Sequence, residues 1–145
     1  MASALSKERL RVWLRMLKAT RAVEAELRER MRLTFGTTLP RFDVMAALHR
    51  AGGLRMSELS AALRVSNGNV TGIVDRLAED GLVRREAVAG DRRSSRVHLT
   101  EKGRKDFEEM AAIHELWVDE LLSPIGPPGL DTILTRLGRL TEGRS

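Results

Sequence analysis

The sequence predicts a mainly α-helical chain with one small β-hairpin. In several stretches apolar residues recur every three or four positions, which places them on one face of a helix. One stretch, 95–99, instead alternates polar and apolar residues, as in a half-buried strand. Of the 145 residues, 42% are hydrophobic and 31% are charged, a balance that supports a packed core and excludes wholesale disorder.

A long helix and a short one are expected first. The apolar stripe of the long helix covers 10–31, and the stretch 36–40 should end it, because it holds a glycine and a proline. The apolar positions at 42–49 predict the short helix. A stub of strand is expected at 54–56.

Two more short helices are predicted, joined by a tight turn at Val65–Ser66. Ser57 is expected to cap the first of them, with Glu58 in the first turn, where a carboxylate complements the helix dipole. The second carries an apolar stripe over 70–77, and Gly81 stands where a helix-terminating glycine belongs.

A β-hairpin follows these helices. The stretches 82–88 and 95–99 are its expected strands, and 90–94 is the expected turn because it begins with Gly90 and Asp91. Two short helices followed by a hairpin with a basic tip make up the winged helix-turn-helix plan.

The chain is expected to end in two amphipathic helices. Thr100 caps the first, whose stripe covers 107–121, and a proline-containing break at 123–129 precedes the last, whose stripe covers 130–140. These stripes and that of the first helix cannot all be buried on so small a domain, so they predict a partner surface on a second copy. The expected interface residues are Leu10, Trp117, Leu121, Leu134 and Leu137. The expected organisation is a helical dimerisation region, 1–35 and 101–145, around a winged helix-turn-helix domain, 36–100.

The outer face of the fourth helix is small and polar. Gly68 and Gly72 lie one turn apart opposite the apolar stripe, although each costs roughly 0.8–1 kcal/mol relative to alanine. Close approach by duplex DNA explains them, and the alternative is close helix packing inside the protein. Asp75 would repel phosphate and is expected to steer an arginine, either Arg76 or a neighbour. The candidate DNA contacts on this helix are Ser66, Asn67, Gly68, Asn69, Thr71, Gly72 and Arg76.

The hairpin is rich in arginine. Five arginines stand between 84 and 96, and the acids among them are Glu86 and Asp91. Arginine suits narrow minor grooves, where the negative potential is enhanced. Asp91 can form a forked ion pair with Arg93 and so fix the direction in which the tip points. The alternative for the whole arginine-rich stretch is an ordinary solvated turn. The candidate DNA contacts on the hairpin are Asp91, Arg92, Arg93 and Arg96.

Composition and charge narrow the classes of function. The chain has no cysteine, which excludes disulfide scaffolds, thiol nucleophiles and iron–sulfur sites, and its scarcity of aromatic residues disfavours single-strand binding by base stacking. The net charge is +5, with +8 in residues 1–99 and −3 in 100–145, so the first two thirds of the chain are basic and suit an anionic partner.

The sequence contains no motif typical of an enzyme or of a metal-binding protein. We find no nucleophile–base pair, no phosphate-binding glycine loop and no cluster of metal ligands, so neither an enzyme nor a metal or cofactor site is expected. No apolar run approaches the ~18 residues of a membrane span. A soluble, cytoplasmic protein with no membrane partner is therefore expected.

Two motifs resemble one known family. The stretch 91–100, DRRSSRVHLT, resembles the wing of the MarR (multiple antibiotic resistance regulator) family of bacterial transcription regulators. The stretches 69–77 and 79–83 are similar to its recognition helix and the exit from that helix. The resemblance implies a homodimer joined through its terminal helices, with two recognition helices in successive major grooves of a pseudopalindromic operator. It also implies that Arg93 enters a minor groove, with Asp91 as its support.

The resemblance further implies a small aromatic or phenolic effector. Many members of the family release DNA when such a compound binds between the dimerisation and DNA-binding parts. A urate-responsive branch is matched by Trp13 and Asp43 but not by Ile73, which stands where that branch has an arginine. The pocket would be lined by Trp13, Met16, Leu17, Phe42, Asp43, Met45 and His49, for which the alternative is plain core.

The expected function is therefore that of a sequence-specific regulator of transcription that binds double-stranded DNA, a homodimeric repressor that responds to a ligand. The alternative is a winged-helix module that binds another protein and no DNA. The arginine-rich hairpin favours DNA, because the core of a protein–protein interface is depleted of charge.

Overall fold

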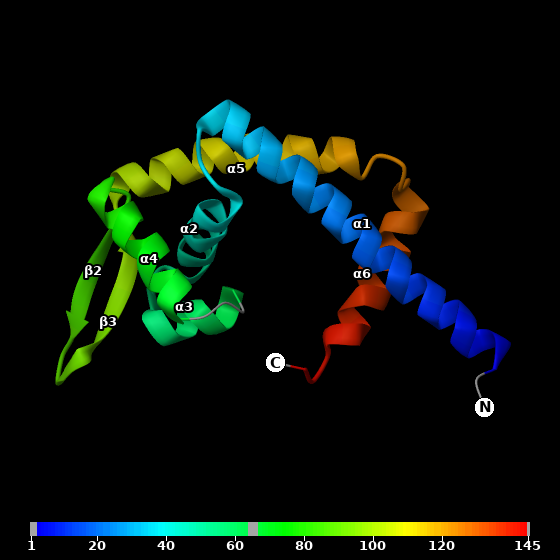
Figure 1. Cartoon of the computed structure of the whole chain (residues 1–145), viewed down its shortest axis with the longest axis horizontal. Coiled ribbons are helices and arrows are strands. Elements are labelled where there is room, and N and C mark those ends of the chain that lie inside the picture. The colour runs from blue at the N-terminus through cyan, green and yellow to red at the C-terminus, as the bar shows by residue number, and fades with distance from the viewer. Residues whose placement is uncertain (1–2, 64–66, 145) are drawn as a thin grey trace.

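The computed structural model describes residues 3–63 and 67–144, without the side chains at 67, 68 and 91–94. It confirms a mainly helical winged helix-turn-helix chain with one small sheet (Figure 1). The expected turn at Val65–Ser66 lies outside the described residues. The elements are α1 (Ala4–Phe35), α2 (Leu39–Ala51), β1 (Leu54–Arg55), α3 (Met56–Leu63), α4 (Asn67–Glu79), β2 (Val83–Val88), β3 (Asp91–Leu99), α5 (Glu101–Leu121) and α6 (Pro127–Thr141).

The compact helices and the hairpin gather at one end of the molecule, and the terminal helices extend to the other (Figure 1). α5 bridges the two ends, because it starts beside the hairpin and runs on to α6. The C-terminal part of α1 packs against α5, and a groove lies between the rest of α1 and α6. The three strands form an antiparallel sheet in the order β1-β3-β2.

The predicted breaks after α1 and α5 are confirmed, but the next helix begins inside each proline-containing stretch, earlier than the sequence pattern predicted. α2 begins at Leu39 with Pro40 in its first turn, and the Thr38 side chain caps it by accepting a hydrogen bond from the Arg41 amide at 3.3 Å. α6 begins in the same way, at Pro127. The first turn of a helix does not use its N–H groups internally, so proline fits there without loss.

The predicted cap of α3 is wrong. The helix begins at Met56, so Ser57 lies inside it. The carboxylate of Glu58 instead accepts a hydrogen bond from the Arg55 amide at 2.9 Å, which satisfies a donor just before the helix.

The hairpin turn is shorter than predicted. β3 begins at Asp91, so most of the expected turn at 90–94 is strand. The register passes from the pair Ala87–Ser95 directly to Val88–Asp91, so the intervening residues 92–94 bulge from the ladder. The basic tip is therefore a bulge on β3 rather than a loop.

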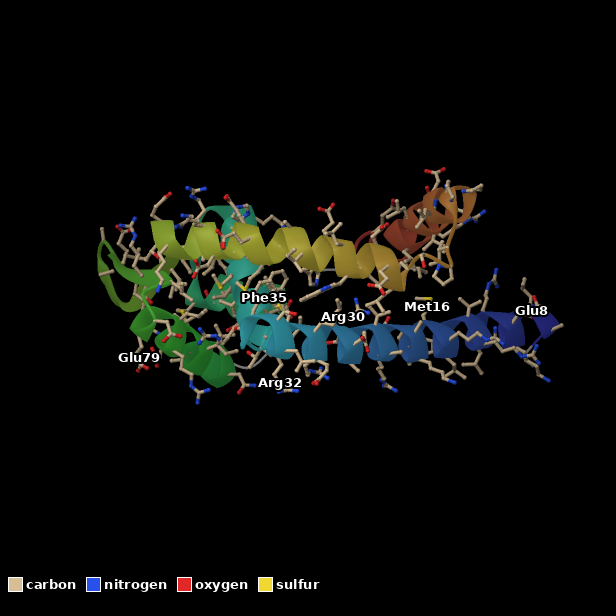
Figure 2. All side chains as sticks on the ribbon, turned by 90° about the horizontal axis from the view of Figure 1, so that it is seen from above. Glu8, Met16, Arg30, Arg32, Phe35 and Glu79 are labelled. Carbon is tan, nitrogen blue, oxygen red and sulfur yellow. The ribbon has the colours of Figure 1, made fainter. Side chains whose placement is uncertain are left out.

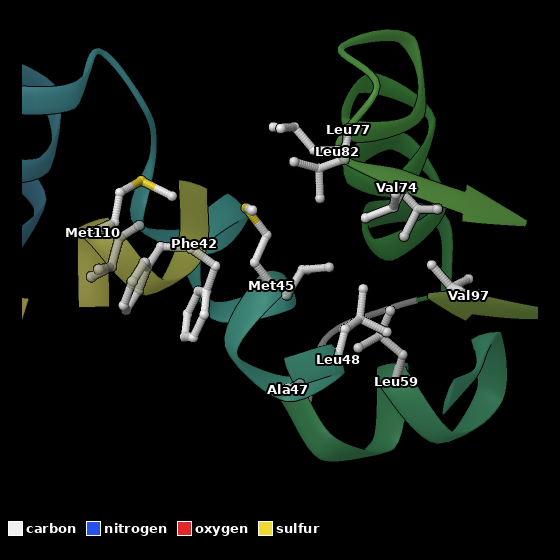
Figure 3. Close-up of a cluster of buried hydrophobic side chains, with 14 of the residues drawn as sticks. Phe42, Met45, Ala47, Leu48, Leu59, Val74, Leu77, Leu82, Val97 and Met110 are labelled. Atoms are coloured by element: carbon white, nitrogen blue, oxygen red, sulfur yellow. The ribbon is translucent and has the colours of Figure 1, made fainter. Parts of the chain in front are cut away.

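The core lies where α2, α3, α4 and the sheet meet (Figure 3). The apolar stripe predicted for α4 is confirmed, because Val70, Val74 and Leu77 are fully buried. Met45 of α2 and Leu59 of α3 pack into the same cluster. The opposite face of α4 is consequently turned away from the protein.

A glycine brings α5 against the turn that follows α4. A Cβ at Gly103 would lie 1.9 Å from the carbonyl oxygen of Leu82, so no larger residue fits without movement. Thr100 caps α5 as predicted, since its hydroxyl accepts a hydrogen bond from the Gly103 amide at 3.0 Å. The same hydroxyl donates to the carbonyl of Gly81 at 2.7 Å. The α4–β2 turn is thus fixed to the first turn of α5.

Candidate nucleic-acid interface

The outer face of α4 is open. Apart from the backbone of its own helix, no described atom lies within 4 Å of the position that a Cβ on Gly72 would take, so the alternative that this glycine serves packing inside the chain is wrong. Asn69, Thr71 and Arg76 are also exposed. The face is therefore slim and polar. Asn67 and Gly68 lie in the first turn of α4, Ser66 lies outside the described residues, and their contacts with DNA stay predictions.

Asp75 holds an arginine of the hairpin. Its carboxylate lies 2.7 Å from the guanidinium of Arg85 on β2. The prediction that Asp75 steers an arginine is confirmed, but the partner is Arg85 rather than Arg76. The ion pair joins the end of α4 to the root of the hairpin.

A second anchor, which the sequence did not indicate, fixes the turn after α4. The guanidinium of Arg41 on α2 donates a hydrogen bond to the carboxylate of Asp80 at 2.7 Å. Lys102 of α5 donates to the carbonyl of Asp80 at 3.2 Å. The turn after α4 is therefore bonded to α2 and to α5. Arg41 lies 39 residues before Asp80 in the chain, and Lys102 lies 22 residues after it.

The hairpin arginines fall into two groups. Arg92 and Arg93 belong to the bulge of β3, close to Asp91, and the pairing of Asp91 with Arg93 stays a prediction because their side chains are not described. Arg96 is exposed and donates a hydrogen bond to the carbonyl of Gly53 at 3.3 Å.

The candidate ligand-pocket residues do not share one cavity in the single chain. Met16 lines an apolar groove of about 630 Å³ between α1 and α6. Met45 borders a cavity of about 240 Å³ beside the start of α2, and His49 borders one of about 260 Å³ beside the start of α5. Trp13 is exposed, Leu17 is half-buried, and Phe42 and Met45 are buried in the core.

Aromatic rings join α2 to α5, and two titratable groups on these helices have shifted pKa values. Phe42 stacks on Phe107 of α5 with centroids 5.3 Å apart and contacts the His114 ring at 4.7 Å. Burial lowers the pKa of His114. The pKa of Asp43 is raised, because surrounding protein displaces part of its solvent and Glu24 lies near it.

The residues expected at a dimer interface remain largely uncovered in the single chain. Leu10, Leu134 and Leu137 are 55%, 73% and 41% exposed. Trp117 packs against Phe35 at 5.9 Å between ring centroids, and both Trp117 and Leu121 are half-buried.

An ion pair holds α1 beside α5. The guanidinium of Arg30 lies 2.7 Å from the carboxylate of Glu120, and Figure 2 shows Arg30 between the two helices. The same arginine pairs with Glu26 one turn earlier.

Two negative findings apply to the described part of the chain. None of its helices combines the length and the apolarity that crossing a membrane requires. No group of three or more histidine or acidic side chains is placed to hold a metal ion there.

The sequence pattern of the MarR family matches residues 35–94, from the end of α1 into β3. YfiV of Bacillus subtilis, described as an uncharacterized HTH-type transcriptional regulator, is 34% identical over 142 residues, which cover 95% of this chain and 88% of YfiV. The chain belongs to the MarR family. Like the other members of that family it is a DNA-binding regulator of transcription and not an enzyme.

Solved structures share the MarR fold over most of the chain. Sco3205, a MarR family regulator of Streptomyces coelicolor crystallised with DNA, has a TM-score of 0.81 at 23% identity and covers 97% of this chain and 89% of its own. NadR, crystallised with 4-hydroxyphenylacetate, has a TM-score of 0.74 at 22% identity, with coverages of 90% and 92%. Both structural similarities show that the chain has the fold of these two proteins.

Proposed function

We propose that this MarR family regulator works in the cytoplasm as a homodimer on a pseudopalindromic operator, with one α4 in each of two successive major grooves. The open space around Gly72 on the exposed face of α4 carries the proposal. A helix that is slim on this face brings its backbone close to base edges. Two-fold symmetry then spaces the half-sites by about one turn, ~10 bp.

Each candidate contact has a chemical role. Asn67 and Asn69 suit adenine edges, Arg76 suits guanine or phosphate, and Thr71 suits phosphate or a thymine methyl group. Ser66, at the start of the helix, suits a phosphate. Gly68 and Gly72 allow the close approach. On the hairpin, Asp91 supports Arg93 in the minor groove, and Arg92 and Arg96 flank it.

The uncovered apolar surface supports the dimer. The groove between α1 and α6 is lined mainly by apolar side chains, and the leucines of α6 are exposed beside it. A surface of this kind is typical of an interface. Charge supports the same pairing, because the stretch 7–32 has nine basic and four acidic residues and 100–145 has nine acidic and six basic residues.

The proposed effector is a small aromatic or phenolic acid that lowers affinity for DNA and so relieves repression. NadR, which has the same fold, was crystallised with such a compound. Because the candidates Met16, Met45 and His49 border three separate cavities in one chain, we propose that the effector site is completed by the second copy.

A mobility-shift titration against the region upstream of the protein's own gene tests the proposed function. Tight, sequence-dependent binding that weakens steeply between 50 and 200 mM salt is expected, because phosphate contacts release counterions. Replacing Arg93 with Ala should cost about 1–3 kcal/mol of binding free energy. Equal affinity for unrelated duplexes would refute a specific regulator. Stable capture of a protein partner by a chain that binds no DNA would support the interaction module instead.

A further inference from the structure

The three-stranded sheet has an outer face on which Arg96 is the one residue among the proposed DNA contacts. On the inner face Val83 and Val97 are buried, and Arg85 reaches Asp75 of α4. Side chains alternate along a strand, so the outer face holds the residues between these. The outer face consists of Arg84 and Glu86 of β2, Arg96 and His98 of β3, and Arg55 of β1.

This outer face is positively charged. Its three arginines are exposed and share the face with one carboxylate, Glu86, which lies 3.1 Å from Nε2 of His98. Arg55 stands directly opposite Arg96 in the register, and like charges in that position destabilise a sheet. Within the described residues, neither Arg55 nor Arg84 has a carboxylate partner. The protein therefore keeps two uncompensated guanidinium groups on this face, Arg84 on the projecting hairpin and Arg55 on the neighbouring strand β1.

We propose that Arg55 and Arg84 bind backbone phosphates of the DNA that flanks the operator. This inference rests on the proposed function, because it extends the surface whose tip carries Arg93. The hairpin projects from the helical body beside α4, so its outer face is continuous with the proposed wing (Figure 1). An arginine that binds a phosphate and no base edge adds affinity that does not depend on the DNA sequence.

Strand geometry limits how far this contact reaches. Arg84 lies four residues from Val88, the last residue of β2, which corresponds to about 13 Å at ~3.3 Å per residue. DNA rises about 3.4 Å per base pair, so the contact extends the site by at most about four base pairs on each side. The affected DNA lies just outside the base pairs that the tip of the hairpin protects.

Duplex length is the variable that tests this inference. A footprint first locates the outermost base pairs protected by the hairpin tip. The protein is then titrated with one duplex that ends at those base pairs and with two longer duplexes. Each longer duplex carries six more base pairs at each end, and the added sequences of the two are unrelated to each other. The wild type should bind both longer duplexes more tightly than the short one, and equally to each other.

The double variant R55Q/R84Q should lose the preference for the longer duplexes and keep wild-type affinity for the short one. The slope of log affinity against log salt on the longer duplexes should fall by about four, roughly one for each of the four guanidinium groups that a dimer loses. R55K/R84K retains the charge and should retain most of the preference. R21Q removes an exposed arginine of α1, outside the sheet, and should keep the wild-type preference for the longer duplexes.

Two results overturn the inference while the proposed function stands. One is equal wild-type affinity for the short and longer duplexes. The other is a loss of affinity in R55Q/R84Q that is the same for every length, because the arginines would then act inside the operator. Failure of the wild type to distinguish operator from unrelated DNA overturns the proposed function and, with it, this inference. Thermal melting of each variant confirms that it is folded.

Discussion

The carboxylate of Asp75 and the guanidinium of Arg85 lie 2.7 Å apart and join α4 to the hairpin. The two side chains are 51% and 36% exposed, so the pair contributes only about 0.2–1 kcal/mol to stability. Its consequence is geometric. Because it joins the two DNA-binding elements, we expect it to help fix the direction of the hairpin relative to α4, so that the helix and the wing reach the same duplex together.

Breaking this pair should weaken binding of the operator with little effect on melting temperature. D75N, R85Q and the double variant form a cycle that separates the coupling from the change in net charge. We expect a coupling of about 0.2–1 kcal/mol in binding free energy, measured by fluorescence anisotropy. Strictly additive single effects would show that the ion pair does not orient the hairpin.

Replacing Gly72 with Ala should change stability and affinity in opposite directions. Alanine in a helix interior is favoured over glycine by about 0.8–1 kcal/mol, and the added methyl group meets open space. The same methyl group should obstruct DNA and weaken operator binding. Denaturant unfolding and anisotropy measure the two effects. A more stable variant with unchanged affinity would mean that DNA does not approach this part of α4.

Replacing Gly103 with Ala should destabilise the fold. The Cβ would lie 1.9 Å from the Leu82 carbonyl oxygen, and relief of such a contact typically costs about 1–3 kcal/mol. Gly138 of α6 provides the matched control, since a Cβ there meets no described atom outside its own helix backbone within 4 Å and alanine should stabilise by about 0.8–1 kcal/mol. Urea titrations compare the two variants. Equal stability of the two would contradict the packing described at the start of α5.

Stability should respond to pH through Asp43. Its pKa in the folded chain is raised above its ordinary value of 3.8, so losing the proton opposes folding. Below the unfolded pKa both states hold the proton and the penalty is absent. Once pH exceeds the raised folded pKa, the penalty is complete. D43N should therefore melt like the wild type at pH 3 and at a higher temperature at pH 7. A difference that does not change with pH would contradict this assignment.

Local patterns predicted the order of elements and the buried face of α4, because both depend on spacing along the chain. Residues 70–77 carry a helical repeat that is independent of the rest of the fold. The two proline-containing stretches end α1 and α5 as predicted, but the starts of the helices that follow were placed too late for a physical reason. Proline breaks the interior of a helix but fits its first turn. Only the position of the proline relative to the helix start distinguishes these two cases, and the sequence pattern does not give that position.

Contacts between distant segments could not be predicted in this way. The pairs Arg41–Asp80 and Asp75–Arg85 join residues whose approach depends on how α2, α4 and the sheet pack together. The need for glycine at 103 likewise arises from the Leu82 carbonyl, which is brought there by the tertiary fold. The sequence indicated that Asp75 holds an arginine, but only packing determined which one.

Selection of binding sites from random duplexes, followed by competition titration, shows whether the dimer recognises a specific operator. We expect recovery of an inverted repeat with half-sites about 10 bp apart, bound at least ~10³-fold more tightly than a scrambled duplex at physiological salt. Recovery of no common sequence, with equal affinity for the selected and scrambled duplexes, would contradict this expectation.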